Sequence, residues 1–76
     1  MGHIIIDIRG TQYRCTPFYD TDNSSTNVDV YLEETYWDDP NSSYLGEVED
    51  IEIPDIEDKD ALNYFTDQIE DWLNGK

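Results

Sequence analysis

Basic residues are scarce in this chain of 76 amino acids. Four Lys and Arg residues stand against 19 Asp and Glu residues, which gives a formal net charge of −15 at pH 7. Lys and Arg supply most of the affinity of proteins for phosphate backbones and anionic surfaces. No apolar run approaches the ~20 residues that a membrane-spanning helix needs. We therefore expect neither nucleic acid nor a membrane among the direct partners of this protein.

Cysteine and histidine each occur once. Cys15 has no second cysteine for an internal disulfide and no export signal is recognisable, which together predict a reducing, cytoplasmic compartment. We expect Cys15 to pack in the core rather than to act as a nucleophile. His3 has no Ser or Cys partner in a recognisable motif, and the four Gly residues form no phosphate-binding loop. We therefore predict a protein that is not an enzyme, with no catalytic residues and no cofactor.

The segment from Asp20 to Ser24 resembles the opening of a calcium-binding loop. In such a loop the sixth position is a glycine that permits a sharp turn, and the twelfth is a bidentate glutamate. Ser25 and Tyr31 occupy these two positions here. The segment is therefore predicted to be a polar loop without a metal ion.

The N-terminal part of the chain has the pattern of a β-hairpin. Strands at about residues 3–9 and 12–18 flank Gly10-Thr11, a two-residue turn with glycine first, which suits type II′ geometry. This turn predicts the following cross-strand pairs: Ile8 with Tyr13, Asp7 with Arg14, and Ile6 with Cys15. One face of the hairpin would then be apolar, and the other would carry an Asp7–Arg14 ion pair.

Two further strands follow the hairpin. A polar loop at residues 20–27 precedes an alternating strand at about 28–37. A turn at 38–43 leads into a fourth strand at about 44–53, in which a bulge near Asp50 would restore the alternation.

An amphipathic helix is predicted at about residues 59–74, with Asp58 as N-cap and Gly75 as the stop signal. Its apolar face consists of Leu62, Phe65, Ile69, Trp72 and Leu73. The elements together predict a single domain over residues 1–76 with a two-layer α+β fold. In this fold one helix packs on one face of a four-stranded antiparallel sheet.

Acidic side chains are concentrated in the second half of the chain, along the predicted fourth strand, the segment after it and the outer face of the helix. The candidate partner-binding residues are Glu47, Glu49, Asp50, Glu52, Asp55, Glu57, Asp58, Asp60, Asp67, Glu70 and Asp71. On the helix, Asp60 and Asp67 are ~10 Å apart and Asp71 lies ~6 Å further on, whereas duplex DNA carries one charge per ~1.7 Å of its axis. Two interpretations are open. The carboxylates imitate the charge of a nucleic acid, or they only confer solubility.

Aromatic residues flank the predicted turn at 38–43, namely Tyr31, Tyr36, Trp37 and Tyr44. Tyr and Trp beside carboxylates are typical of interface anchors, so these four are secondary interface candidates. The alternative is a second apolar cluster on the open face of the sheet. The strand at 28–37 is also a candidate edge, whose free backbone groups would pair with a second copy of the chain and form a homodimer.

In size, acidity and sheet-plus-helix outline, the whole chain resembles the small acidic inhibitors that phages and mobile elements use against host defence. These include anti-CRISPR, anti-restriction and uracil-glycosylase-inhibitor proteins. The resemblance involves no shared motif and carries over no functional residue. It implies a noncatalytic nucleic-acid mimic in the host cytoplasm, bound to the basic surface of a nucleic-acid-binding protein. The alternative is a small structural or assembly protein that dimerises through an edge strand.

Overall fold

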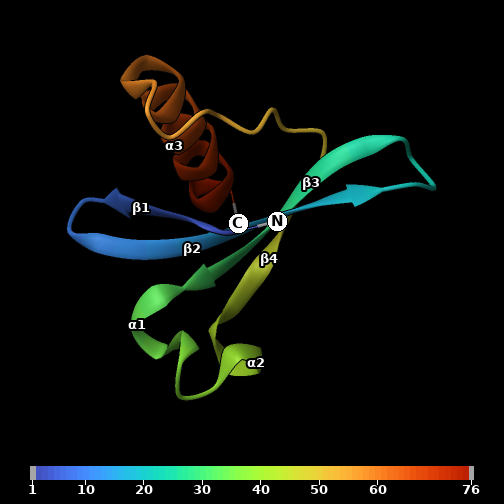
Figure 1. The fold of residues 1–76 in the computed structure, drawn as a ribbon. Helices are drawn as coiled ribbons and strands as arrows, with labels where there is room; N and C mark the ends of the chain where they lie inside the picture. Colours follow the sequence, from blue (N-terminus) through green and yellow to red (C-terminus); the bar gives the residue numbers. More distant parts are fainter. Residues whose placement is uncertain (1, 76) are drawn as a thin grey trace.

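The computed structural model describes residues 2–75, and its four strands form one antiparallel sheet with a long helix across one face (Figure 1). The elements are β1 (Ile4–Ile8), β2 (Thr11–Asp20), β3 (Ser25–Leu32), α1 (Glu33–Tyr36), α2 (Pro40–Ser43), β4 (Tyr44–Val48) and α3 (Lys59–Asn74). Each strand pairs with its neighbour in the chain, in the order β1-β2-β3-β4. The predicted two-layer α+β fold is confirmed. Residues 1 and 76 of the predicted domain lie outside the described part of the chain.

The hairpin of β1 and β2 forms as predicted, but its turn and register differ from the prediction. The turn consists of Arg9 and Gly10, both with positive φ (54° and 86°), which is type I′ rather than type II′ geometry. The observed pairs are Ile8 with Thr11, Ile6 with Tyr13, Ile5 with Arg14 and Ile4 with Cys15. The predicted register is therefore wrong by two residues. Every side chain nevertheless stays on its predicted face, because the side-chain period of a strand is two.

The predicted Asp7–Arg14 ion pair is absent because of this shift. Asp7 lies opposite Gln12, and its carboxylate accepts a hydrogen bond of 3.0 Å from the backbone N–H of Gly10. Arg14 instead forms an ion pair with Glu33, at the start of α1. Alternation alone does not discriminate between the two registers, since both place the same residues on the same faces.

The turn between β2 and β3 is tighter than the predicted loop at residues 20–27. The carboxylate of Asp20 accepts hydrogen bonds from the backbone N–H groups of Asp22 and Asn23, at 3.0 and 3.3 Å. Such an Asx turn reverses the chain within a few residues. Half of the predicted loop, residue 20 and residues 25–27, therefore belongs to the two strands.

The predicted strand at 28–37 is too long at its C-terminal end. β3 ends at Leu32, and the chain continues into α1, whose first turn holds two glutamates where the helix dipole favours negative charge. β3 also lies between β2 and β4, so the prediction that it forms an edge of the sheet is wrong. The edges of the sheet are β1 and β4.

The predicted fourth strand at 44–53 is also too long, since β4 ends at Val48. A β-bulge shifts the register of its pairing with β3 between Val30 and Tyr31, and Leu45 packs against the core. The irregularity predicted near Asp50 is a residue with left-handed backbone (φ 54°) beyond the strand, not a bulge within it. The backbone N–H of Ile51 then bonds to the carbonyl of Thr26 at 3.0 Å, and the Ile51 side chain returns to the core.

The bounds predicted for α3 and its cap are confirmed. The carboxylate of Asp58 accepts hydrogen bonds from the backbone N–H groups of Asp60 and Ala61, at 3.1 and 3.2 Å. At the other end, the N–H of Gly75 bonds to the carbonyl of Asp71 at 3.1 Å. These contacts satisfy backbone groups that a helix leaves unpaired at its ends.

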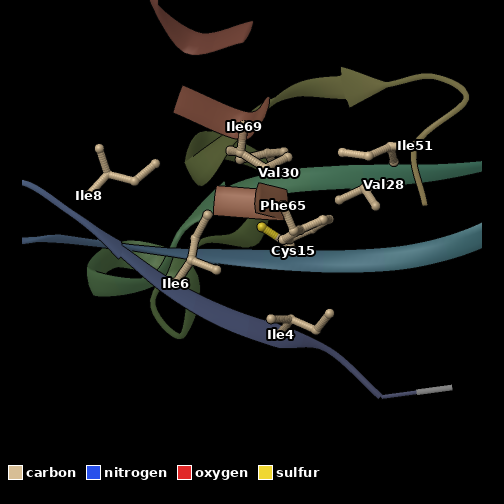
Figure 2. Close-up of a cluster of buried hydrophobic side chains, with 9 residues drawn as sticks. All are labelled: Ile4, Ile6, Ile8, Cys15, Val28, Val30, Ile51, Phe65 and Ile69. Atoms are coloured by element: carbon tan, nitrogen blue, oxygen red, sulfur yellow. The ribbon is translucent and has the colours of Figure 1, made fainter. Parts of the chain in front are cut away.

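A single hydrophobic core lies between α3 and the sheet (Figure 2). It consists of Ile4, Ile6, Ile8, Cys15, Val28, Val30, Ile51, Phe65 and Ile69. Phe65 and Ile69 are 1% and 0% exposed, and Leu62, Trp72 and Leu73 pack at its margin. The predicted apolar face of the helix is therefore the face that it buries.

Replacement of Phe65 by Ala is expected to destabilise the protein by ~3–5 kcal/mol, because it removes buried apolar area and leaves a cavity. Asp67→Ala, on the exposed side of the same helix, is the matched control and should change the free energy of unfolding by no more than ~0.5 kcal/mol. Urea unfolding followed by circular dichroism measures both values. An unchanged unfolding midpoint for Phe65→Ala would show that another face of α3 is buried.

Candidate functional site

Ten of the eleven candidate carboxylates are exposed, and they follow β4, the connector of residues 49–58 and the outer side of α3. We call the eleven residues the acidic surface. The connector lies against α3, since Glu52 and Pro54 line one hollow together with Ala61, Tyr64 and Phe65 of the helix. The structure therefore brings carboxylates of the connector and of α3 onto adjoining surface.

Glu70 differs from the other ten members of the acidic surface. Its carboxylate lies 3.1 Å from the guanidinium of Arg9, and its side chain is 27% exposed. Arg9 belongs to the β1–β2 turn, so this ion pair joins the turn to the C-terminal half of α3. Part of the charge of Glu70 is thus balanced within the chain.

Two members of the acidic surface also order the connector. The carboxylate of Asp58 caps α3, and that of Asp55 accepts a hydrogen bond of 3.0 Å from the backbone N–H of Glu57. The backbone N–H of Asp58 in turn bonds to the carbonyl of Asp55 at 2.9 Å. These bonds give the connector a defined backbone where a charged segment of this kind would otherwise vary in conformation.

A buried asparagine, which the sequence pattern did not reveal, positions the start of the acidic surface. Asn27 is 0% exposed, and its amide N–H groups donate to the carboxylates of Glu47 and Asp20, at 3.2 and 3.5 Å. Its carbonyl oxygen accepts hydrogen bonds from the hydroxyl of Ser25 and the backbone N–H of Asp50, at 2.8 and 3.1 Å. One side chain therefore links the β2–β3 turn to the end of β4 and to Asp50, the left-handed second residue of the connector.

The four aromatic residues chosen from the sequence lie together beside Arg14, and we call these five residues the aromatic cluster. The ring of Tyr31 lies 5.1 Å from that of Tyr36 and 5.3 Å from that of Tyr44, between ring centres. Tyr36 contacts Trp37 edge-to-face at 5.5 Å. Trp37 and Tyr44 are 74% and 44% exposed. The cluster is thus partly a second packing centre and partly an exposed aromatic surface.

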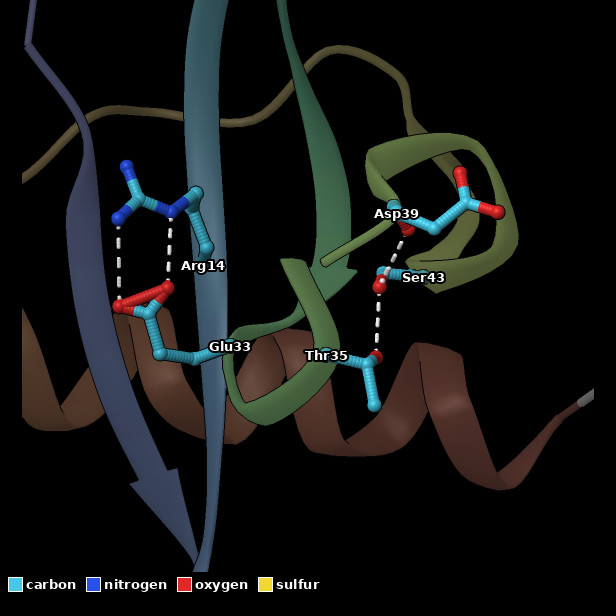
Figure 3. A network of polar contacts seen from close by, with 5 residues as sticks. All are labelled: Arg14, Glu33, Thr35, Asp39 and Ser43. Carbon is cyan, nitrogen blue, oxygen red and sulfur yellow. Dashed lines mark hydrogen bonds and ion pairs between the residues drawn. The ribbon is translucent and has the colours of Figure 1, made fainter. Parts of the chain in front are cut away.

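Arg14 is the centre of the aromatic cluster and is buried. Its guanidinium lies 4.3 Å from the ring centre of Tyr36 and 4.9 Å from that of Trp37. Two of its N–H groups donate to the carboxylate of Glu33, at 2.9 and 3.2 Å (Figure 3). This bidentate pair compensates the buried positive charge.

A short chain of hydrogen bonds holds α2 to α1 beside this pair (Figure 3). The Ser43 hydroxyl donates to the carbonyl of Asp39 at 2.9 Å, so the Thr35 hydroxyl, 2.6 Å away, donates to Ser43. Asp39 also caps α2, and hydrogen bonds from Ser42 hold the pKa of its carboxyl below the usual value. The two short helices therefore form one unit that fixes Tyr36 and Trp37.

Glu33→Gln is expected to destabilise the protein by ~3–5 kcal/mol, because it leaves the buried guanidinium of Arg14 without a countercharge. Glu34→Gln is the matched control, since Glu34 is the next residue of α1, is exposed and forms no ion pair in the described part of the chain. Thermal unfolding of both variants tests this expectation. Equal melting temperatures would show that the Arg14–Glu33 pair contributes nothing.

The core position predicted for Cys15 is confirmed. Its side chain is 0% exposed, and burial raises the pKa of the thiol to about 12, so the thiolate nucleophile is disfavoured. The segment from Asp20 to Ser24 forms the tight β2–β3 turn, and no cluster of three or more His, Cys, Asp or Glu side chains within residues 2–75 is arranged to hold a metal ion. Across the same residues, no helix has both the length and the apolar character needed to span a membrane.

The free energy of unfolding should fall as the pH rises above about 9. Burial raises the pKa of Cys15, and burial together with the charge of Asp29 raises the pKa values of Tyr31 and Tyr44. Below the unfolded-state values of 9.0 for Cys and 10.0 for Tyr, both states are protonated and the full stability is present. Above these values only the unfolded state loses protons. Deprotonation of Cys15 in the unfolded state then lowers the free energy of unfolding by about 1.4 kcal/mol per pH unit.

Urea unfolding at about pH 8, 9 and 10 measures how the free energy of unfolding changes with pH. Cys15→Ser retains a side chain of similar size without a thiol, so its loss of stability between about pH 9 and 10 should be shallower than that of the parent protein. Parallel slopes for the two proteins would contradict the assignment to Cys15.

Comparisons with protein-family models, with curated proteins and with solved structures give no significant match to this chain.

Proposed function

We propose that this protein is a noncatalytic inhibitor that imitates nucleic acid. Its target would be the basic nucleic-acid-binding surface of a host defence or DNA-processing protein in the cytoplasm of a host cell. Anti-CRISPR and anti-restriction proteins are the functional classes that fit this description.

The observation that carries the proposal is the exposure of ten carboxylates along β4, the connector and α3. Asp60, Asp67 and Asp71 follow the outer side of a capped helix, at separations of ~10 and ~6 Å along its axis. A rigid row of negative charge is complementary to a groove lined by Lys and Arg, and it accelerates the encounter with such a groove.

The crowding of the carboxylates favours a role in binding a partner over a role in solubility alone. Asp29 of β3 and Glu47 of β4 lie directly opposite each other in the sheet, where like charges are destabilising. Solubility requires net charge but no such concentration of charge on one surface. Asp29 is not one of the eleven residues of the acidic surface, and it adds its charge to that of Glu47 at the β4 end of that surface.

The proposal predicts binding that competes with nucleic acid and weakens steeply with salt. Surface plasmon resonance can test guide-RNA-loaded Cas9-type effectors, restriction endonucleases and uracil-DNA glycosylase against the immobilised protein, with and without a competing DNA oligonucleotide. Binding to at least one should be lost with the oligonucleotide and should fall at least ~10-fold between about 50 and 200 mM salt.

The effect of a charge-reversing substitution on binding affinity should depend on its position in the structure. Glu49→Lys, Glu52→Lys and Asp67→Lys should each weaken this binding. Glu34→Lys, in α1 on the far side of the sheet from α3, is the control of equal charge change (Figure 1). Asp7 is less suitable as a control, because its carboxylate accepts a hydrogen bond from the backbone of the β1–β2 turn. Affinity that is indifferent to salt and oligonucleotide, or equal effects of all four substitutions, would exclude nucleic-acid mimicry.

The alternative is a structural or assembly protein that forms a homodimer through an edge strand. β1 supports it, because this edge strand is rich in isoleucine and Ile5 is 36% exposed on the side away from the core. Such a dimer would persist at high salt and would be unaffected by DNA. The substitution Ile5→Lys should dissociate it into monomers. Sedimentation at the two salt concentrations above separates the two proposals.

A further inference from the structure

A hollow of about 90 Å³ opens within the acidic surface, between the connector and α3. It is lined by Glu52, Pro54, Ala61, Tyr64 and Phe65. Tyr64 is 64% exposed although it is a large aromatic residue. Ile56, also in the connector, is 63% exposed. Apolar side chains are thus present in a surface where charge imitation alone requires only carboxylates.

We propose that this hollow is a socket for one arginine side chain of the partner protein. The inference rests on the proposed function and makes it more specific, since it names the residue type that the acidic surface recognises. Carboxylates of the acidic surface attract a basic groove at long range, whereas the socket would select arginine over lysine at contact.

The lining of the hollow matches the parts of an arginine side chain. Pro54 and Ala61 offer apolar surface to the methylene stem. The ring of Tyr64 offers a face on which a planar guanidinium stacks. Glu52 offers a carboxylate that accepts two parallel N–H bonds from the guanidinium. Lysine has neither the planar group nor the paired donors, so it gains less from the same residues.

The chain already builds this combination once, around its own Arg14. That guanidinium stacks against the rings of Tyr36 and Trp37 and forms a bidentate pair with Glu33. The hollow presents the same two kinds of group, an aromatic ring and a glutamate, with no arginine of the chain among its lining residues. Charge complementarity therefore favours a cation from another molecule, and the combination of ring and glutamate favours a guanidinium.

The position of Tyr64 on α3 also agrees with this occupant. Asp60 lies four residues before it and Asp67 three residues after it, so both carboxylates flank the ring on the same side of the helix. Arginines in nucleic-acid-binding grooves contact phosphates and stack on bases. In the socket, carboxylates would replace the phosphates and the ring of Tyr64 would replace a base.

Two peptides of equal charge test the socket, acetylated and amidated nona-arginine and nona-lysine, with isothermal titration calorimetry at one salt concentration. The parent protein should bind nona-arginine about 5-fold more tightly than nona-lysine. Tyr64→Ala should weaken nona-arginine binding about 3–5-fold and change nona-lysine binding less than about 2-fold. Tyr64→Phe retains the ring and should bind like the parent protein. Tyr19→Ala, which removes a tyrosine that is 59% exposed in β2, is the matched control.

Glu52→Gln and Glu57→Gln remove the same charge from the connector, but only Glu52 lines the hollow. Glu52→Gln should weaken nona-arginine binding about 10-fold, and Glu57→Gln about 2-fold. Both residues are exposed, so both variants should fold, as circular dichroism would verify.

The outcomes separate the socket from the proposed function. Equal affinity for the two peptides, or arginine preference that survives Tyr64→Ala and Glu52→Gln, would overturn the socket while the acidic surface remained a binding surface. Failure of both peptides to bind would overturn the socket and the nucleic-acid mimic together.

Discussion

The packing of α3 on one face of the sheet is the contact on which the rest of the molecule depends. With a net charge of −15, the elements of this chain repel one another at long range. The opposing attraction comes mainly from one core, in which Phe65 and Ile69 meet the inner residues of the strands. A domain of this size buries only ~60% of its unfolded surface, so little further apolar area is available. The same helix presents its carboxylates on the opposite side.

The other face of the sheet is organised by a polar interaction. Arg14 is buried beneath Tyr36 and Trp37, and Glu33 provides its countercharge. This pair fixes α1 and α2, which cover part of a face that would otherwise be open (Figure 1). The secondary interface candidates therefore have a structural role as well, although Trp37 remains largely exposed. Tyr31 and Tyr36 belong to a second packing cluster on this face, whereas an interface role for the exposed Trp37 and Tyr44 stays a prediction.

Charge and shape contribute differently to the proposed function. Carboxylates spread over the connector and α3 provide attraction that acts over ~8–10 Å and that salt weakens. In the proposed socket, the hollow at Tyr64 and Glu52 would add contacts that depend on the shape of the entering side chain. An inhibitor that used charge alone would bind many basic proteins. A few shaped contacts within the charged surface would restrict it to grooves that place an arginine at the right point.

Local signals in the sequence determined the fold class, the hairpin, the bounds of α3 and the burial of Cys15, because alternation, helical period and capping act over a few residues. The net charge and its concentration after Glu47 are likewise properties of the sequence alone. Tertiary structure decided the two-residue shift of the hairpin, the partner of Arg14 and the buried position of Asn27. It also brought Glu52 beside Tyr64. These features join residues distant in sequence, and their geometry follows from how strands and helix pack, which no local pattern records.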